Sequence, residues 1–202
     1  PVLLFPSQYI DPASTETGAY FHWVSFVDPK RRTRMIKEGI DTVHNSECRS
    51  LKANLERKAG HTGAVPASYR IETDTIFVDA PVEVGVNFLQ DVSHVAEWAH
   101  LLAPENPNDP GSGKFVDEYG QRVEASVHVR EMGGYFLLEQ DFAYTDSNFV
   151  QRGPAIMIPC SYAFGDESAL GFLLHRIAFF PEGETLRNGH LTIDDYGAES
   201  IN

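Results

Sequence analysis

The chain contains little cysteine and no long apolar run. Two of its 202 residues are cysteines, Cys48 and Cys160, which supports neither a disulfide framework nor a Cys-x-x-Cys metal pair and favours a reducing compartment. No stretch approaches the roughly 18 consecutive apolar residues that a membrane-spanning helix needs. The sequence therefore predicts a cytoplasmic protein with no membrane span and no metal site.

Positive charge is also scarce. The chain holds 16 Lys and Arg against 29 Asp and Glu, a formal net charge of -13, which disfavours nucleic acid or an anionic membrane surface as the main partner. A Gly-x-Ser-x-Gly motif, a phosphate-binding loop and a Gly-x-Gly-x-x-Gly motif are missing from the sequence. The chain begins with Pro1 rather than Met and lacks a basic signal-peptide start, which predicts a fragment or a processed product.

Residues 69–102 have the clearest local pattern. Apolar and polar residues alternate over 69–77, with the period of a half-buried strand. Pro81 suits the first position of a helix, because its missing N–H would be unpaired there. Ser93 is expected to cap a second short helix, which carries Trp98. The segment therefore predicts one long strand followed by two short helices.

Strands dominate the sequence after this helix pair. Residues 123–129 alternate between apolar and polar, which predicts a strand with one buried and one wet face. Gly133 and Gly134 predict a hairpin turn. The next strand is expected to place four aromatic or apolar residues on one face, namely Phe136, Leu138, Phe142 and Tyr144.

The chain resembles itself at an offset of 153 residues, with nine identities in 41 aligned positions. The repeat predicts that residues 1–61 are the last part of a first unit, with strands near 2–10 and 19–27 and a long helix over about 29–59. Residues 61–68 are expected to form a linker, and 66–202 a second unit. The identical pairs are Pro1/Pro154, Pro6/Pro159, Tyr9/Tyr162, Gly18/Gly171, His22/His175, Phe26/Phe179, Arg34/Arg187, Ile40/Ile193 and Asp41/Asp194.

The order of elements resembles the START-like superfamily, also called SRPBCC or Bet v 1-like. The residues that carry the resemblance are the strand 69–78, the turn Asp79-Ala80-Pro81-Val82-Glu83-Val84, the segment Phe88-Leu89-Gln90-Asp91-Val92, and Trp98. The helix segment 44–56 is similar to the closing helix of bacterial polyketide aromatase/cyclases, some of which carry two tandem units.

The resemblance implies an α+β helix-grip fold. In that fold a curved antiparallel sheet wraps around a long α-helix, two short helices follow the first strand, and a cavity lies between sheet and helix. The second unit ends midway along its own closing helix at Asn202. Either the chain is part of a longer didomain protein, or the helix over 29–59 closes the second unit.

The resemblance also implies a function. The cavity would bind a hydrophobic polyketide-like substrate and promote its cyclisation and aromatisation by aldol closure and dehydration. Such chemistry needs positioning and general acid–base groups, and no cofactor. One alternative is a non-catalytic carrier of a lipid or another hydrophobic small molecule, and another is a structural domain with a filled cavity, which predicts no pocket. Converging polar groups, His175 among them, would favour the enzyme, and an all-apolar lining would favour the carrier.

Two residues are the catalytic candidates. His175 lies on a strongly predicted strand and suits proton transfer near neutral pH, although a core histidine with a satisfied hydrogen bond is the alternative. Tyr162 could donate a hydrogen bond to an enolate oxygen, although packed aromatic residues are common in sheets. The candidates for substrate binding are Trp98, Tyr135, Tyr144, Gln140, Arg152, His22 and Tyr9.

Lys30, Arg31, Arg32 and Arg34 form a basic patch at the start of the predicted long helix. Positive charge at a helix N-terminus opposes the macrodipole, so local stability does not explain the patch. One hypothesis is that it docks an acidic acyl carrier protein, and the alternative is a solvated basic edge. A homodimer is also left open.

Overall fold

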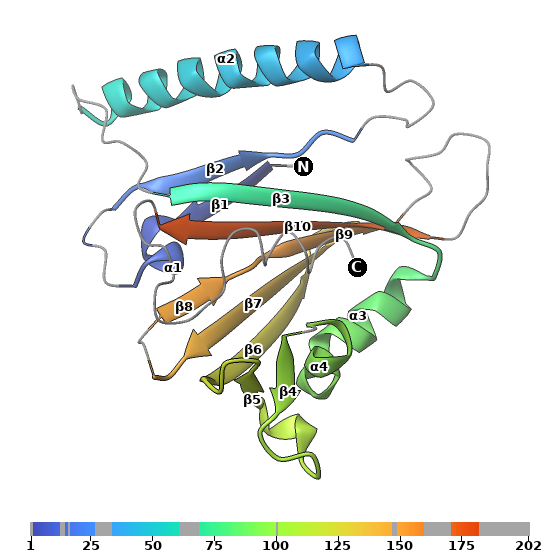
Figure 1. Cartoon of the computed structure of the whole chain (residues 1–202). Coiled ribbons are helices and arrows are strands. Elements are labelled where there is room, and N and C mark those ends of the chain that lie inside the picture. Colours follow the sequence, from blue (N-terminus) through green and yellow to red (C-terminus); the bar gives the residue numbers. More distant parts are fainter. Residues whose placement is uncertain are drawn as a thin grey trace. The chain divides into compact units, whose positions relative to one another are not determined.

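The computed structural model describes residues 2–12, 15, 17–26, 34–60, 69–99, 101–146, 149–159 and 171–181. Within these ranges, only the backbone is described for 34–37, 69–70, 149 and 180–181. The chain divides into two compact units, Pro1–Ala67 and Ser68–Asn202. Each unit has its own antiparallel sheet (Figure 1).

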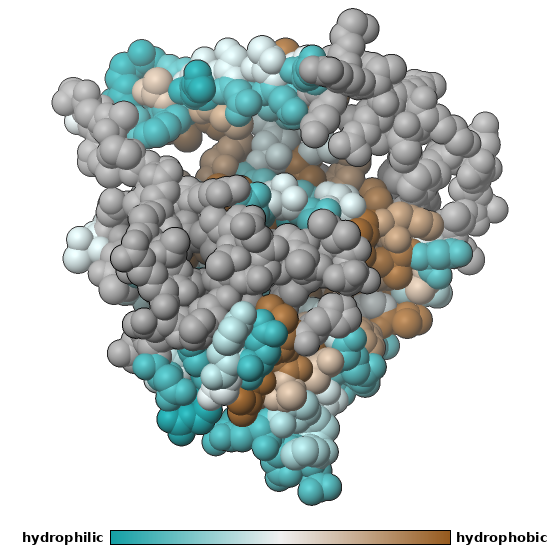
Figure 2. Space-filling model, in the orientation of Figure 1, coloured by the Kyte–Doolittle hydropathy of each residue, from teal (hydrophilic) through white to brown (hydrophobic). Residues whose placement is uncertain are grey.

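The first unit consists of a hairpin and a long helix. Strand β1 (Val2–Pro6) pairs with β2 (Ala19–Trp23), and the short α1 (Ser7–Ile10) follows β1. Helix α2 spans Arg34–Lys58 and is followed by Gly60, whose φ of 81° a glycine adopts without strain. The predicted long helix is confirmed over 34–58. Figure 2 shows mainly hydrophilic residues on the face of α2 that is turned towards the viewer, at the top.

The predicted first strand is too long. It was expected to run over 2–10, but the chain turns into α1 directly after Pro6. Proline has no N–H to donate to a neighbouring strand, so it is a poor interior strand residue. The N–H of Ser7 instead donates to the carbonyl of Gly18 at 3.0 Å and closes the hairpin.

The second unit is built on an eight-stranded antiparallel sheet. Seven strands have the order β3-β10-β9-β7-β6-β5-β4, and β8 pairs with β7 beyond this path. The predicted strand over 69–78 is confirmed as β3. The strands are β3 (Tyr69–Val78), β4 (Leu102–Pro104), β5 (Lys114–Asp117), β6 (Arg122–Glu131), β7 (Phe136–Tyr144), β8 (Phe149–Arg152), β9 (Ala155–Pro159) and β10 (Phe172–Pro181).

Short helices connect β3 to β4. They are α3 (Val82–Gln90), the 3-10 turn η2 (Val92–His94) and α4 (Val95–Trp98), and a further turn, η3 (Pro110–Ser112), precedes β5. The two expected helices are present, but their caps differ from the prediction. Pro81 is the residue before α3 rather than its first helical residue. Asp91, and not Ser93, caps η2, because its carboxylate accepts a hydrogen bond from the Ser93 N–H at 2.9 Å.

The expected helix-grip fold is wrong. The described residues of the second unit form a large antiparallel sheet with only short helices, and no long helix is wrapped by this sheet in the part that the structure describes. The long helix α2 belongs to the first unit. The apolar stripe of α2 predicted a helix but could not say against which surface it packs. Val43 and Leu55 of that stripe are 53% and 54% exposed.

Two core clusters of the second unit lie on the face of the sheet that packs against α3 and α4, here called the core face. Residues 123, 125, 127 and 129 face inwards with exposed residues between them, as predicted. Gly133 and Gly134, with φ of 68° and 109°, form the predicted turn between β6 and β7. One cluster contains Val95, Ala99, Phe115, Val123, Phe142 and Tyr144, and a second contains Val82, Leu138, Ala155, Met157 and Phe172.

Candidate functional site

A hollow opens beside α4 on the core face of the second unit. It holds about 300 Å³ of empty space, counting the part that is open to solvent, and its enclosed part has room for about one water molecule. Most of the lining is apolar, with one amide, one phenol and one guanidinium among it. The lining residues are Trp98, Ala99, Leu101, Leu102, Phe142, Tyr144, Gln151 and Arg176.

Trp98 forms the aromatic wall of this hollow. It ends the single-turn helix α4, which is fixed in the core by Val95 and Ala99, 1% and 3% exposed. The indole packs edge-on against Phe142, with ring centroids 6.0 Å apart and planes at 67°. Such edge-to-face pairs contribute stabilising free energy in addition to that from the surface area they bury. The position of Trp98 is therefore set by the packing of α4 against the sheet.

Arg176 brings a positive charge to the same wall. Its guanidinium carbon lies 5.3 Å from the centroid of the Trp98 ring, where the electron-rich ring face attracts a cation. Arg176 reaches this face because it pairs with Ala155 of β9, a residue of the core cluster. A molecule in the hollow would meet a flat aromatic ring and a charged donor together.

Two buried amides lie on the same face of the sheet. Gln151 on β8 is 7% exposed and pairs directly with Phe142. Gln140, two residues before Phe142 on β7, is 1% exposed, and its Nε2 has no hydrogen-bond partner within the described part of the chain. A buried donor without an acceptor costs about 1–3 kcal/mol. Of these two amides, only Gln151 lines the hollow, where its N–H groups can interact with an oxygen acceptor.

His175 does not belong to the hollow. It precedes Arg176 on β10, so its side chain extends from the opposite face of the sheet. There it is 6% exposed, and its Nδ1 lies 2.7 Å from the Thr75 hydroxyl oxygen. The arrangement fits the alternative considered for this residue, a core histidine with a hydrogen-bond partner. Proton transfer in the hollow by His175 finds no support in this geometry.

Arg152 also extends from the face opposite the hollow. It pairs with Asp141 across β7 and β8, and its Nη1 lies 3.4 Å from the Asp141 Oδ2. Burial raises the pKa of Asp141, although the charge of Arg152 opposes this shift. Arg152 and Asp141 therefore form a half-buried ion pair away from Trp98.

The remaining candidates are dispersed or lie outside the described residues. Tyr135 lies in the turn between β6 and β7, where its carbonyl accepts from the Met132 N–H at 2.8 Å. In the first unit, Tyr9 stacks on Phe5 with centroids 5.7 Å apart, and burial lowers the pKa of His22. Tyr162, Lys30, Arg31 and Arg32 fall outside the described residues, and for Arg34 only the backbone at the start of α2 is described.

The hollow thus contains two of the predicted site residues, Trp98 and Tyr144. It also contains two polar residues that were not predicted as site residues, Gln151 and Arg176. Arg176 could have been found, because it is the one residue with a permanent charge in the apolar segment 172–179. Gln151 gave no comparable signal, since isolated glutamines are frequent on protein surfaces.

None of the helices in the described residues is both long enough and apolar enough to cross a bilayer.

A comparison with protein families gives one match. The profile of a family described as Domain of unknown function (DUF8713) matches residues 1–64 and 71–202, and so covers most of both units. No curated protein matches the chain.

Proposed function

The chain belongs to the family Domain of unknown function (DUF8713), and we propose that it binds a small, largely apolar molecule in the hollow beside α4. The observation that carries this proposal is the lining: Trp98, Phe142 and Tyr144 provide aromatic surface next to the guanidinium of Arg176. Ligand sites in proteins are typically lined by apolar and aromatic side chains, with a few polar groups that orient the ligand.

The polar groups indicate what the ligand carries. Arg176 and Gln151 both offer N–H donors at the hollow. A flat apolar molecule with a carboxylate or carbonyl oxygen at one end would stack on Trp98 and accept hydrogen bonds from these donors. Because the enclosed part of the hollow is narrow, such a ligand would remain partly open to solvent.

Cyclisation of a polyketide-like substrate is the second candidate. The presence of Tyr144, Gln151 and Arg176 at one hollow favours it, because such groups can hold carbonyl oxygens and donate to an enolate. Two observations rank it below simple binding. The enclosed space has room for about one water molecule, and His175, the expected proton-transfer group, lies on the opposite face and bonds to Thr75.

Calorimetric titration with naphthalene-2-carboxylate tests the proposal. We expect the chain to bind this probe, Trp98→Ala to weaken binding by about tenfold or more, and Arg176→Met to weaken it several-fold. Arg130→Met is the matched control, because Arg130 is an exposed arginine of β6 that pairs with Glu139. If the probe did not bind, or if all three variants bound alike, the hollow would not be the site.

A further inference from the structure

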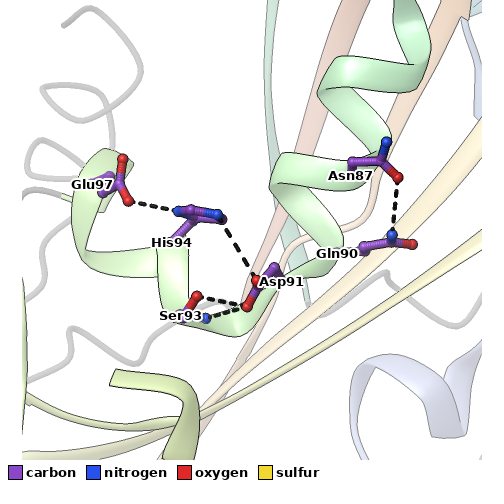
Figure 3. Close-up of polar contacts among 6 residues, drawn as sticks. All are labelled: Asn87, Gln90, Asp91, Ser93, His94 and Glu97. Carbon is purple, nitrogen blue, oxygen red and sulfur yellow. Dashed lines mark hydrogen bonds and ion pairs between the residues drawn. The ribbon is translucent and has the colours of Figure 1, made fainter. Parts of the chain in front are cut away.

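The corner between α3 and α4 contains a histidine that contacts both helices. His94 Nδ1 lies 2.6 Å from Glu97 Oε1 on α4, and His94 Nε2 lies 3.9 Å from Asp91 Oδ2 at the end of α3 (Figure 3). The imidazole also stacks on Phe88 of α3, with ring centroids 4.6 Å apart and planes at 19°. A single side chain therefore connects the last turn of α3 to the only turn of α4.

Asp91 is held in place on its other side. Its Oδ1 accepts hydrogen bonds from the Ser93 N–H at 2.9 Å and from the Ser93 hydroxyl at 2.7 Å (Figure 3). These hydrogen bonds lower the pKa of Asp91, so the carboxylate stays charged beside the imidazole. Asp91 of the α3 end and Glu97 of α4 are the charged groups that act on His94 within the described residues.

The two carboxylates favour the imidazolium form. The hydrogen bond to Glu97 is the largest cause, and the negative charges of Glu97 and Asp91 add to it, so the pKa of His94 lies above the ordinary value of 6.5. Partial desolvation acts in the opposite direction and is outweighed. The two carboxylates therefore extend the pH range over which His94 carries its positive charge to above its ordinary limit.

Helix α4, which His94 contacts through Glu97, also forms part of the wall of the hollow. Helix α4 is a single turn, Val95–Trp98, and a helix of this length does not hold itself together without outside contacts. His94 immediately precedes the turn, and Trp98 ends it against Phe142. Contacts that fix His94 therefore add to the core packing of Val95 and Ala99 in restricting the indole of Trp98.

We propose that His94 is a positioning residue for the hollow and makes its ligand affinity depend on pH. This inference rests on the proposed function of the hollow. The imidazolium donates a hydrogen bond to Glu97 and attracts Asp91. These contacts keep α4 folded and Trp98 in the wall of the hollow. Neutral His94 loses most of this attraction, the turn loosens, and the aromatic wall is less well formed. Affinity is therefore high in mild acid and falls as the pH rises through the titration of His94.

Heteronuclear NMR of the indole N–H of Trp98 tests the first half of the inference. The chain has two tryptophans, so Trp98→Phe assigns the signal. We expect the Trp98 signal to shift between about pH 5.5 and 8.5, with a midpoint above 6.5. His94→Gln should remove the shift, and Glu97→Gln should lower its midpoint. His128→Gln, which removes an exposed histidine of β6, should change neither.

Calorimetric titration of naphthalene-2-carboxylate at both ends of this range tests the second half. We expect binding about threefold weaker at the high pH, and no such difference in His94→Gln. A Trp98 signal that did not move with pH would overturn the positioning role, and a moving signal with constant affinity would overturn the control of binding. If the probe bound at no pH, the proposed function would fail, and the indole titration would still decide whether His94 positions Trp98.

Discussion

The hairpins β1–β2 and β9–β10 have the same register and different surroundings. Leu3 pairs with His22 in the first hairpin, and the residues 153 positions later, Ile156 and His175, pair in the second. All five residue pairs of β1 and β2 have a paired counterpart in β9 and β10 at this offset. The two hairpins therefore share their register at the 153-residue offset of the predicted repeat.

One face is buried in both hairpins. Leu3 and Phe5 are 5% and 4% exposed in the first hairpin, and Ile156 and His175 are 0% and 6% exposed in the second. The other face differs between them. Leu4 is 66% exposed, whereas its counterpart Met157 is fully buried in the core beneath α3. The same strand pattern therefore permits two degrees of burial, and the elements packed around a hairpin decide between them.

The largest difference in stability is expected between substitutions at Met157 and at its counterpart Leu4. Met157→Ala removes a side chain with 0% exposure from the core, and it should lower the free energy of unfolding of the second unit by about 2–5 kcal/mol. Leu4→Ala removes a mostly exposed side chain and should cost less than about 1 kcal/mol. Urea-induced unfolding measures both variants. Equal losses would mean that the two faces are buried alike.

Two glycines give the next comparison. A Cβ at Gly171, next to β10, would lie 2.4 Å from the Phe77 ring and 2.6 Å from the Val78 carbonyl oxygen. At its counterpart Gly18, next to β2, nothing lies within 4 Å of the same atom. Gly171→Ala should therefore lower the free energy of unfolding by about 1–3 kcal/mol, because the backbone at Val78 cannot give way.

Gly18→Ala serves as the control for this substitution and should leave the stability within about 0.5 kcal/mol of the parent chain. Thermal unfolding followed by circular dichroism measures both variants. A loss at Gly18 as large as that at Gly171 would show that the first hairpin is as tightly covered as the second.

Local structure followed well from the sequence where one physical signal dominated. The alternation over 69–77 predicts β3, the glycine pair at 133–134 predicts the β6–β7 turn, and the apolar stripe with Gly60 predicts α2. These signals depend on neighbouring residues alone. Tertiary arrangement also depends on residues that are far apart in the sequence. The helix-grip prediction was wrong because a stripe of apolar side chains does not specify the sheet that it packs on.

The candidate site was harder to predict for a related reason. Both faces of β10 carry buried residues, since Phe172 and Ile177 lie on opposite faces and are 2% and 0% exposed. With no contrast between an apolar and a polar face, the sequence could not decide whether His175 or Arg176 turns towards Trp98. The choice of His175 followed from its chemistry, whereas the register places Arg176 at the hollow.

His22 of the first hairpin gives the smallest expected effect on stability. Burial lowers the pKa of His22 below 6.5, so the folded chain binds this proton less readily than the unfolded chain does. As the pH falls, the unfolded state therefore binds this proton before the folded state does. The contribution of His22 to the free energy of unfolding is fully present above pH 6.5 and is lost as the pH falls through the lowered pKa. His22→Gln should flatten this part of the stability profile in urea unfolding measured at several pH values. His128→Gln, which removes an exposed histidine, should keep the slope, and an unchanged slope in His22→Gln would mean that His22 does not contribute to it.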